Sequence, residues 1–542
     1  MSDSANIARH LPLMAAQQPA HPALKVPRGR APDGSIDYLS LTFAELDREV
    51  DAWCAPLQKS GVRRGDRTLI MVKQGLPLIA AVFALFKLGA VPIVIDPGMG
   101  LKSFLQCVAR SKPRVILGIP LARIISRVFS RTFSTVKIRI AASNSPTKQL
   151  SLSGQSNPLD YFTPVTVAAN ELAAILFTSG STGAPKGVCY EHGMFEAQVR
   201  MIRDHYDIKP GEVDLPMLPI FALFNPALGM TTVVPEIDPR RPAEVDPAKI
   251  VQAIIQESVT TSFGSPTLWL KIQQHCLNHN IQLPSLRRVL CAGAPVPAEL
   301  WQDPRRWLPN GTLHSPYGAT ESLPVSSISA IEIEPNNLRG ACVGRPLSGM
   351  EVKIISLTSS DAAISDVPRG EIGEIIVHGP VVTKTYDSLP QATAAAKITD
   401  GNITWHRMGD CGYLDASGQL WFVGRKIERV QTTTGTLFTE PCEQVFRAHP
   451  KITRCALIGL GSPGQQMPAL VVEAVPRNTA EKRRLARELH QLALGHPDTT
   501  AINLFFFIER LPVDVRHNAK IHRLSLAQWA TTAKGYESDH HR

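Results

Sequence analysis

The stretch "LFTSGSTGAPKGVCY" (residues 176–190) places alternating Gly, Ser and Thr, then Pro-Lys-Gly, directly after an apolar run. Small side chains let backbone N–H groups approach an anion closely, and the hydroxyls and Lys186 add donors and positive charge. It is not the Walker pattern, because no Gly-Lys-Ser/Thr ends it and Pro185 precedes the lysine. A plain Gly/Ser surface turn is the alternative, but the lysine and the preceding strand pattern favour a phosphate-binding loop.

Outward from this loop, helix patterns alternate with strand patterns. Thr42, with Glu45 three residues later, matches a capping box, and apolar residues then recur at helical spacing until Gly61. The stretches "TLIMV", "FALFKLGAVPIVIDPG" and "CVARSKPRVILGI" continue the alternation, which predicts βα units and parallel sheets. Residues 129–164 are polar and poorly periodic, so we expect a surface excursion there.

The predicted secondary-structure pattern changes twice in the second half of the chain. From about Gly340, short strands such as "EVKIISL", "GEIGEIIVHG" and "GQLWFVG" predict a small antiparallel, barrel-like unit. After Gly424, a helix, two strands, a basic helix and a further strand predict a small α+β domain. The fold class is therefore α/β: a large N-terminal domain of βα-built sheets with a barrel-like subdomain (residues 1–423), then a small mobile α+β C-terminal domain (residues 424–542).

Composition narrows the protein class. A chain of 542 residues is too long for one core, and 44% hydrophobic with 19% charged residues is typical of soluble globular proteins. The most apolar window, residues 77–98, contains Lys87 and Gly89 and cannot supply the roughly 20 apolar residues of a bilayer span. No signal-peptide layout begins the chain, so we expect a cytoplasmic protein without a transmembrane segment. The nine cysteines include no C-x-x-C pair, which favours core thiols over zinc ligands or disulfides.

The formal net charge is +10, and the basic residues are spread along the chain. No aromatic-interleaved stripe accompanies the small basic clusters, so solvated helix faces explain the charge better than a nucleic-acid site, and we expect no nucleic-acid partner. An acidic ligand, a membrane surface or an acidic partner would also suit it.

Four further stretches place polar residues near predicted strands. They are "CAGAPV" (291–296), "SPYGATES" (315–322), "MGDCGYLD" (408–415) followed by "GRK" (424–426), and "LPVDVRHNAKIHR" (511–523). Small residues at a strand end leave room for a flat ring, a glutamate is a suitable ligand for a hard cation, and an aspartate can accept hydrogen bonds from vicinal hydroxyls. Each pattern alone is commonly structural, and their combination favours a site.

In this order, the motifs from Thr42 to Arg523 resemble the adenylate-forming superfamily, which includes acyl-CoA synthetases, nonribosomal adenylation domains and beetle luciferase. The resemblance implies ATP and Mg²⁺ as cofactors. It implies a nucleotide site made of loop residues Thr178, Ser179, Gly180, Ser181, Thr182, Gly183 and Lys186, adenine-pocket residues Gly293, Ala294, Pro295, Tyr317 and Gly318, and ribose-binding residues Asp410 and Arg425.

The same resemblance implies three catalytic residues. Thr320 would offer a hydroxyl to phosphate, Glu321 would be the Mg²⁺ ligand, and Lys520 would bridge the substrate carboxylate and the α-phosphate from a C-terminal loop. The implied first step is attack of a carboxylate on the α-phosphorus of ATP, giving an acyl-adenylate and pyrophosphate.

Three positions depart from the superfamily pattern. Ile427 stands at the hinge, where Asp or Lys is usual, Leu437 replaces an arginine in the following turn, and Ala222 replaces a gate histidine. These changes argue against a rotating, CoA-using second step. A β-hydroxyl already tethered to the activated carbonyl could serve as the nucleophile instead, because effective molarity replaces a second binding event.

One branch of the superfamily, the β-lactone synthetases of bacterial long-chain olefin biosynthesis, performs that reaction. The chain resembles it through "TSGSTGAPKGVCYEHGMFEAQV" and "LPMLPIFALFNPALGMT". The resemblance implies long-chain 2-alkyl-3-hydroxyalkanoic acids as substrates, a β-lactone, AMP and pyrophosphate as products, and assembly with hydrolase-like and reductase partners. The enzymatic alternative is a long-chain acyl-CoA synthetase or fatty acyl-AMP ligase, and a silent nucleotide sensor is a third reading.

Two assignments stay open at this point. Residues 221–230 ("FALFNPALGM") could line a long acyl tunnel or pack as ordinary core. His192 could orient part of the site, although a structural histidine is the commoner case.

Overall fold

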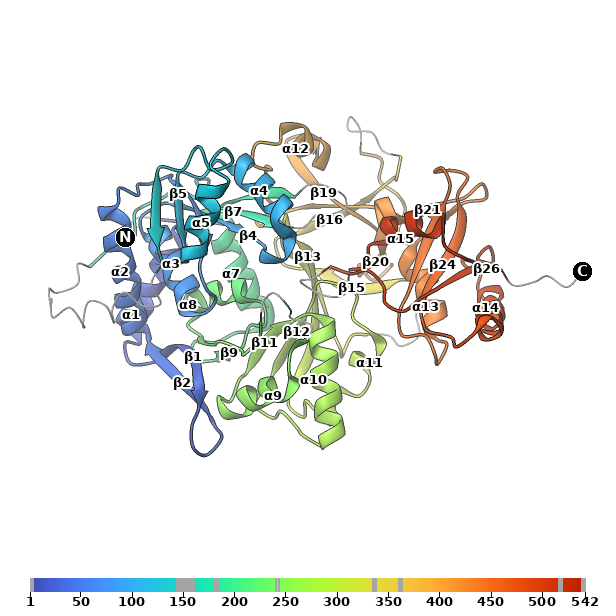
Figure 1. Cartoon of the computed structure of the whole chain (residues 1–542), viewed down its shortest axis with the longest axis horizontal. Helices are drawn as coiled ribbons and strands as arrows, with labels where there is room; N and C mark the ends of the chain where they lie inside the picture. The colour runs from blue at the N-terminus through green and yellow to red at the C-terminus, as the bar shows by residue number, and fades with distance from the viewer. Residues whose placement is uncertain are drawn as a thin grey trace, which may run out of the picture.

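The computed structural model describes residues 4–142, 161–178, 185–238, 241, 244–333, 339–358, 364–514 and 520–537. Figure 1 shows an elongated molecule in which the N-terminal elements lie toward one end and the last elements, coloured orange to red, form a lobe at the other. In the described ranges the strands form sheets of fourteen, six, four and two strands. Ser179, Gly180, Ser181, Thr182 and Gly183, predicted to bind phosphate, lie outside those ranges.

The six-stranded sheet carries the βα units predicted from the alternating pattern. Its strands, in spatial order, are β6 (Ile138–Ala141), β5 (Val115–Gly118), β3 (Arg67–Met71), β4 (Val91–Ile95), β7 (Leu172–Thr178) and β8 (Lys186–Glu191). All neighbours are parallel except β7 and β8. Helices α3 (Leu76–Lys87), α4 (Gly100–Ser111) and α5 (Pro120–Val128) connect successive strands. Parallel strands need such crossovers, so the prediction is confirmed.

Helix α2 (Phe43–Lys59) begins as its sequence predicts. The Thr42 hydroxyl accepts from the Glu45 backbone N–H at 3.2 Å, and the Glu45 carboxylate accepts from the Thr42 backbone N–H at 2.8 Å. Gly61, with φ of +85°, follows the helix end. The capping box and the glycine stop are both confirmed.

The expected surface excursion at residues 129–164 is wrong in its first part. Strand β6 lies there and pairs in parallel with β5, and Phe133 and Val136 are buried beside it. The strand is short and sits at the sheet edge, where basic residues alternate with isoleucines and obscure the apolar pattern. Residues 143–160 lie outside the described part.

The fourteen-stranded sheet forms the larger half of the N-terminal part. Its first strands in spatial order are β2 (Ile36–Thr42), β1 (Pro22–Arg30), β10 (Thr231–Val233), β9 (Val213–Asp214), β11 (Thr261–Gly264), β12 (Arg288–Cys291) and β13 (Thr312–Ala319). From β1 to β13 the neighbours are parallel. Helices α7 (His192–Tyr206), α9 (Pro247–Gln256) and α10 (Pro266–His279) lie between these strands in the sequence, and Trp269 and Trp307 are fully buried in the adjoining core.

The antiparallel unit expected after Gly340 is present and continues the same sheet. It runs through β14 (Ser322–Ser329), β15 (Ala341–Pro346), β20 (Leu420–Arg425), β19 (Ile403–Leu414), β17 (Gly373–His378) and β16 (Glu351–Ile355), with β18 (Lys397–Asp400) paired to β19. Because β15 pairs with β14, this unit is joined to the large sheet by hydrogen bonds.

The C-terminal lobe is built on a four-stranded sheet of β23 (Cys455–Leu460), β24 (Met467–Glu473), β25 (Leu504–Ile508) and β26 (Tyr536–Glu537). Alternate residues face opposite sides, so Leu457 and Phe505 pack in one core and Ile458 and Phe506 in another. Helices α13 (Thr439–Arg447) and α14 (Thr479–Leu494) contribute to the first core, and α15 (Arg523–Ala530) to the second. This is the smaller α+β part that the sequence predicts; its exact boundary at residue 424 remains a prediction.

The remaining elements are short. They are α1 (His10–Gln17), α8 (Asn225–Leu228), α11 (Ala298–Trp301), α12 (Pro390–Ala396), the hairpin strands β21 (Val430–Gln431) and β22 (Thr436–Leu437), and the 3-10 turns η1 (Ile7–Arg9), η2 (Pro97–Met99), η3 (Pro219–Phe224), η5 (Pro304–Arg306) and η6 (Lys426–Glu428). Among the described residues, no helix combines the length and the apolar character needed to cross a bilayer.

Candidate active site

A cavity of about 720 Å³ lies between the two large sheets, bounded by residues of β3, β4 and β7 on one side and of β10, β11 and β13 on the other. Four residues predicted from the sequence line it: Gly293, Gly318, Thr320 and Lys520. They come from the turn after β12, the end of β13 and the C-terminal lobe. The structure therefore brings segments that are distant in the sequence to one cavity.

Apolar side chains form most of the cavity wall. Phe221, Ala222 and Phe224 of η3 line it, and the Phe221 ring packs 4.1 Å from the Phe263 ring of β11, centroid to centroid. Ala222, at the position where the superfamily pattern has a histidine, adds no polar atom to this wall. The later residues of the 221–230 stretch, such as Met230, pack in the core instead. The first residues of that stretch thus line a cavity and the later ones pack as ordinary core; an acyl chain in the cavity stays a prediction.

A buried polar group holds this wall in place. Asn225 donates from Nδ2 to Asp214 Oδ2 at 2.9 Å and to Thr232 Oγ1 at 2.8 Å. Thr232 lines the cavity, and burial raises the pKa of Asp214 to about 7. The group ties the segment after η3 to β9 and β10. This hydrogen-bonded group was not identified from the sequence, because its three residues are not contiguous and form no local motif.

Asp410, Tyr317 and Arg425 form a tight cluster: Asp410 and Arg425 lie on the paired strands β19 and β20, and Tyr317 lies on β13. The Tyr317 hydroxyl donates to Asp410 Oδ2 at 2.6 Å, and Arg425 Nη1 donates to Asp410 Oδ1 at 2.5 Å. Asp410 pairs directly opposite Arg425 across β19 and β20. Burial, with the Asp410 charge beside it, raises the pKa of Tyr317 well above its ordinary value, and the Asp410 carboxylate raises the pKa of Arg425. The sequence-predicted ribose residues therefore meet a predicted adenine-pocket residue.

The turn after β12 and the end of β13 require glycines. Gly293 has φ of +103°, a conformation that disfavours other residues. A Cβ on Gly318 would lie 2.6 Å from the Ser322 carbonyl oxygen, so only glycine fits there without a shift. Ala294 and Pro295 follow Gly293 in the same turn, and neither lines the cavity.

Two tyrosines position Thr320 and Glu321. The Tyr386 hydroxyl donates to Glu321 Oε1 at 2.8 Å, and the Tyr190 hydroxyl donates to the Thr320 carbonyl oxygen at 2.5 Å. Burial raises the pKa of Tyr386, and the neighbouring Glu321 carboxylate adds to the effect. Sequence reasoning identified neither tyrosine as part of the site. No local signal could have done so for Tyr386, which lies 65 residues from its partner.

Lys186 begins β8, directly opposite Thr178 at the end of β7. This pairing brings together the two ends of the predicted phosphate-binding loop. Lys186 Nζ lies 4.7 Å from the centroid of the Tyr386 ring, and Arg110 donates to the carbonyl of Pro185. The lysine is thus held on the same tyrosine that contacts Glu321.

A second lysine near Glu321 has no counterpart among the predicted residues. Lys397 donates to the Thr383 carbonyl, and its Nζ lies 3.0 Å from His406 Nδ1. Within the described ranges it makes no ion pair with a carboxylate, and burial lowers its pKa to about 8 although Glu321 acts in the opposite direction. Burial, reinforced by the Lys397 charge, lowers the pKa of His406 to about 3.

The donor set around Glu321 fits Mg²⁺. This cation binds proteins through one or two carboxylates and takes its other ligands from phosphate and water. Glu321 is half-buried, one carboxylate oxygen is fixed by Tyr386, and Lys186 stacks on the same tyrosine. A single oriented carboxylate beside basic groups can hold a metal that arrives with a polyphosphate.

Lys520 reaches the cavity from a loop closed at its base. The Lys520 backbone N–H donates to Asp514 Oδ1 at 2.9 Å, and the Asp514 backbone N–H donates to the Lys520 carbonyl at 3.0 Å. Three residues later, Arg523 contacts two buried carboxylates, Glu443 and Glu428. Glu428 directly follows Ile427, the residue at the predicted hinge, which is 49% exposed.

His192 lies in the core beside α3 and is not a cavity-lining residue. It is 3% exposed, and burial lowers its pKa to about 4. These properties favour the structural interpretation of this histidine.

Comparison with known proteins shows which family this chain belongs to. The model of the AMP-binding enzyme family matches residues 13–387. An olefin beta-lactone synthetase of Xanthomonas campestris pv. campestris is 41% identical over 556 residues, covering 98% of this chain and 98% of that protein. An olefin beta-lactone synthetase of Stenotrophomonas maltophilia is 40% identical, covering 98% of this chain and 99% of its own.

Solved structures share the fold at lower identity. ATP-bound MatB from Rhodopseudomonas palustris superposes with a TM-score of 0.78 at 20% identity, covering 98% of this chain and 99% of its own. The o-succinylbenzoate CoA synthetase of Bacillus subtilis, in complex with its acyl-adenylate intermediate, gives 0.76 at 22% identity, covering 96% and 97%. The large sheet-rich part and the smaller C-terminal part are common to these proteins.

Proposed function

Because the chain belongs to the AMP-binding enzyme family, and within it to the olefin beta-lactone synthetase family, it is an ATP-dependent, AMP-forming ligase, and we propose that its substrate is a long-chain 2-alkyl-3-hydroxyalkanoic acid. The observation that carries the proposal is the cavity wall: an apolar space that extends from Thr320 and Lys520 past Phe221 and Ala222. Such a space suits alkyl chains attached to a carboxylate at its polar end.

In the proposed complex, ATP lies across the polar clusters. Adenine occupies the turn at Gly293–Pro295 and the β13 segment around Tyr317 and Gly318, and the ribose hydroxyls face Asp410 and Arg425. The phosphates lie on the loop between Thr178 and Lys186 and near Thr320. The support is geometric. Gly293, Gly318 and Thr320 line the cavity, and Tyr317, which contacts Asp410, lies between the lining residues Pro316 and Gly318. Asp410 in turn contacts Arg425, and Thr178 pairs with Lys186.

Charge around the phosphates comes from several groups. Glu321 would hold Mg²⁺, which supplies charge neutralisation for the polyphosphate. Lys186 stacks on Tyr386, and Lys397 lies near enough to Glu321 for that carboxylate to raise its pKa against the effect of burial. The Lys397 ammonium makes no ion pair with a carboxylate in the described part of the chain. We include Lys397 among the groups that stabilise the departing pyrophosphate.

The first step activates the acid. A carboxylate oxygen of the substrate forms a bond to the α-phosphorus of ATP, and the bond between that phosphorus and the bridging oxygen to the β-phosphate breaks. Lys520 donates to the oxygens on which negative charge grows, where a fixed cation lowers the barrier most. The products of this step are the acyl-adenylate and pyrophosphate.

The second step closes the ring. The β-hydroxyl oxygen forms a bond to the acyl carbonyl carbon and its proton passes to water. The bond between that carbon and the phosphate oxygen breaks, and AMP leaves with the electron pair. The nucleophile and the carbonyl belong to one molecule, so no second substrate has to bind. The absence of a histidine at position 222 fits an acceptor that is already inside the cavity.

The decisive experiment supplies ATP, Mg²⁺ and a long-chain 2-alkyl-3-hydroxy acid without any thiol. We expect AMP, pyrophosphate and β-lactone in equal amounts. The matched control is the same acid lacking the 3-hydroxyl group, for which we expect adenylate formation and pyrophosphate release without lactone. Turnover that begins only when CoA is added would assign the chain to the acyl-CoA synthetases instead.

We further propose that the enzyme acts in the cytoplasm together with hydrolase-like and reductase enzymes of the same pathway. The support is the near full-length similarity to enzymes named for olefin biosynthesis. Co-purification of the tagged chain with such enzymes from a host that contains them tests the assembly. Recovery of the chain alone would contradict it.

A further inference from the structure

Residues 97–142 have an unusual charge composition. They contain nine Lys or Arg residues and no Asp or Glu, although the whole chain holds 47 acidic residues among 542. This segment includes α4, α5 and β6. Helices α4 and α5 pack in one core cluster through residues such as Val108 and Ala122, so their outer faces belong to the same region of the surface.

That region also exposes large apolar side chains. We define the α4–α5 surface by four residues and their exposed fractions: Leu101 (53%), Leu121 (55%), Ile124 (57%) and Val128 (68%). The last three are spaced at i, i+3 and i+7 on α5 and therefore share one face of the helix. The opposite face carries the buried Ala122 and Ser126. Helix α5 thus has two distinct faces: one packs into the core, and the other exposes an apolar stripe to solvent.

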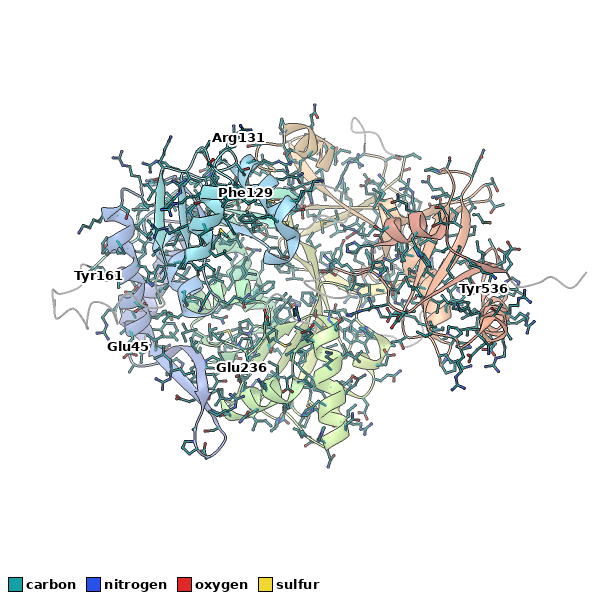
Figure 2. All side chains as sticks on the ribbon, in the orientation of Figure 1. Glu45, Phe129, Arg131, Tyr161, Glu236 and Tyr536 are labelled. Atoms are coloured by element: carbon teal, nitrogen blue, oxygen red, sulfur yellow. The ribbon has the colours of Figure 1, made fainter. Side chains whose placement is uncertain are left out.

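Cations border the apolar stripe. Lys102 follows Leu101, and Arg123, Arg127 and Arg131 lie along and after α5; none of these four makes an ion pair with a carboxylate in the described residues. Arg114, in the same segment, differs because it pairs with Asp66. Figure 2 shows Arg131 at the outer edge of the molecule.

The acyl cavity reaches this surface. Gly100, Leu101 and Phe104 of α4 and Ile125 of α5 all line it. Leu101 lines the cavity and is also 53% exposed, so the cavity opens to the outside beside it. The proposed mouth of the cavity therefore lies on the α4–α5 surface, beside exposed aliphatic side chains and cations that make no ion pair within the described ranges.

We propose that the α4–α5 surface docks on an anionic lipid bilayer and that the long-chain acid enters the cavity from that bilayer through the mouth beside Leu101. An outward apolar stripe flanked by Lys and Arg is the composition of interfacial helices, in which aliphatic residues enter the headgroup region and cations contact anionic lipids. The entry route rests on the proposed function; the docking does not.

Charge complementarity favours an anionic bilayer over a protein as the partner of the α4–α5 surface. The segment has no carboxylate, and eight of its nine cations make no ion pair in the described residues, so it is complementary to a continuous anionic surface. A protein partner is the competing occupant, and protein interfaces are centred on aromatic anchors, whereas the four defining residues here are all aliphatic. A substrate with two alkyl chains is also sparingly soluble in water, so delivery from a bilayer suits its chemistry.

The test uses the full chain and flotation with two kinds of vesicle, phosphatidylcholine alone and phosphatidylcholine mixed with phosphatidylglycerol. We expect binding to the anionic vesicles that weakens from 50 to 500 mM salt, and little binding to the neutral ones. Because each cation near an anionic surface contributes about fivefold to partitioning, Arg127→Glu with Arg131→Glu should reduce binding at least tenfold. Leu121→Ser with Ile124→Ser should reduce it as well.

Matched controls keep the result specific. Ile255, on α9, is exposed to 52%, and Arg483, on α14, is also exposed, so Ile255→Ser and Arg483→Glu make the same chemical changes elsewhere. Both should bind like the unchanged chain. Circular dichroism spectra that match the unchanged chain exclude misfolding of the surface variants, none of which alters a cavity-lining residue.

Three outcomes would overturn the docking proposal: no binding to anionic vesicles, equal binding to both kinds, or full binding by the Arg127/Arg131 variant. Association of the chain into larger oligomers that the Leu121/Ile124 variant abolishes, without vesicle binding, would assign the surface to a second copy instead. The proposed function fails separately, if a detergent-dispersed 3-hydroxy acid gives no lactone while vesicle binding persists. The entry route fails if the surface variants use vesicle-delivered acid as fast as the unchanged chain.

Discussion

Arg523 offers the sharpest test of how the C-terminal lobe presents Lys520. Its side chain is 15% exposed; Nε and Nη2 each donate to a Glu443 oxygen at 2.8 Å, and Nη1 donates to Glu428 Oε2 at 3.0 Å. The side chains of Glu443 and Glu428 are 2% and 6% exposed. One guanidinium therefore joins the start of α15 to α13 and to η6.

Arg523→Ala leaves both carboxylates buried without this cation. Removing one partner of a buried ion pair costs about 3–5 kcal/mol, because an uncompensated charge remains. With a urea m-value of about 2 kcal/mol/M, the midpoint of the transition that reports the C-terminal lobe should fall by roughly 2 M. The measurement is urea unfolding followed by circular dichroism, with Arg483→Ala as the exposed control, expected to change stability by less than about 0.5 kcal/mol.

A double variant separates this explanation from simple loss of packing. Adding Glu443→Gln to Arg523→Ala removes one of the stranded charges, so the double variant should be more stable than Arg523→Ala alone. An unchanged midpoint for Arg523→Ala would refute the reasoning. So would a double variant whose loss of unfolding free energy equals the sum of the losses in Arg523→Ala and Glu443→Gln. Adenylation should also fall in Arg523→Ala and recover in part in Arg523→Lys, which keeps the charge but not the bidentate fork.

Three further predictions follow from the site and the core. Lys520→Ala should reduce acid-dependent ATP–pyrophosphate exchange at least a hundredfold and leave ATP binding by calorimetry within a few-fold, since the lysine acts on charge that develops during attack; equal exchange rates would contradict the assignment. Lys397→Met should slow the same exchange about tenfold with little change in circular dichroism, and a rate equal to that of the unchanged chain would leave this lysine a structural role only. Burial lowers the folded-state pKa of His192 to about 4, so the unfolded chain binds its proton first and stability falls as pH decreases from about 6.5 towards 4. Asp214, with a pKa of about 7, shifts stability with pH in the opposite direction, so the effect of His192 has to be isolated. The measurement is therefore the free energy of unfolding of the unchanged chain minus that of His192→Phe. We expect this difference to change by about 1.4 kcal/mol per pH unit between about pH 6.5 and pH 4.

Local signals explain why much of the fold could be predicted. The capping box at Thr42, the glycine at position 61 and the recurring apolar runs each depend on residues a few positions apart, and the structure confirms them. Strand β6 was missed because a four-residue edge strand with alternating basic residues has almost no apolar pattern. Its existence depends on pairing with β5, which a local reading does not include.

The residues of the site likewise divide into those that local motifs predict and those that depend on long-range contacts. Motif residues such as Gly318, Thr320 and Lys520 could be predicted because their spacing matches a known family pattern, and the structure places them around one cavity. Tyr386 and Lys397 could not, since their roles arise only when the chain folds back and brings them to Glu321. Long-range partners of this kind leave no periodicity or local motif in the sequence.

The contact between Asp410 and Arg425 has a consequence for how a highly charged nucleotide could enter. A lone carboxylate at the proposed ribose position would repel a triphosphate that carries several negative charges. With a guanidinium bonded to one oxygen and a phenol to the other, the carboxylate presents itself as part of an overall neutral assembly. Its remaining lone pairs can still accept sugar hydroxyls, so the proposed ribose site would combine recognition of the sugar with tolerance of the polyanion within three side chains.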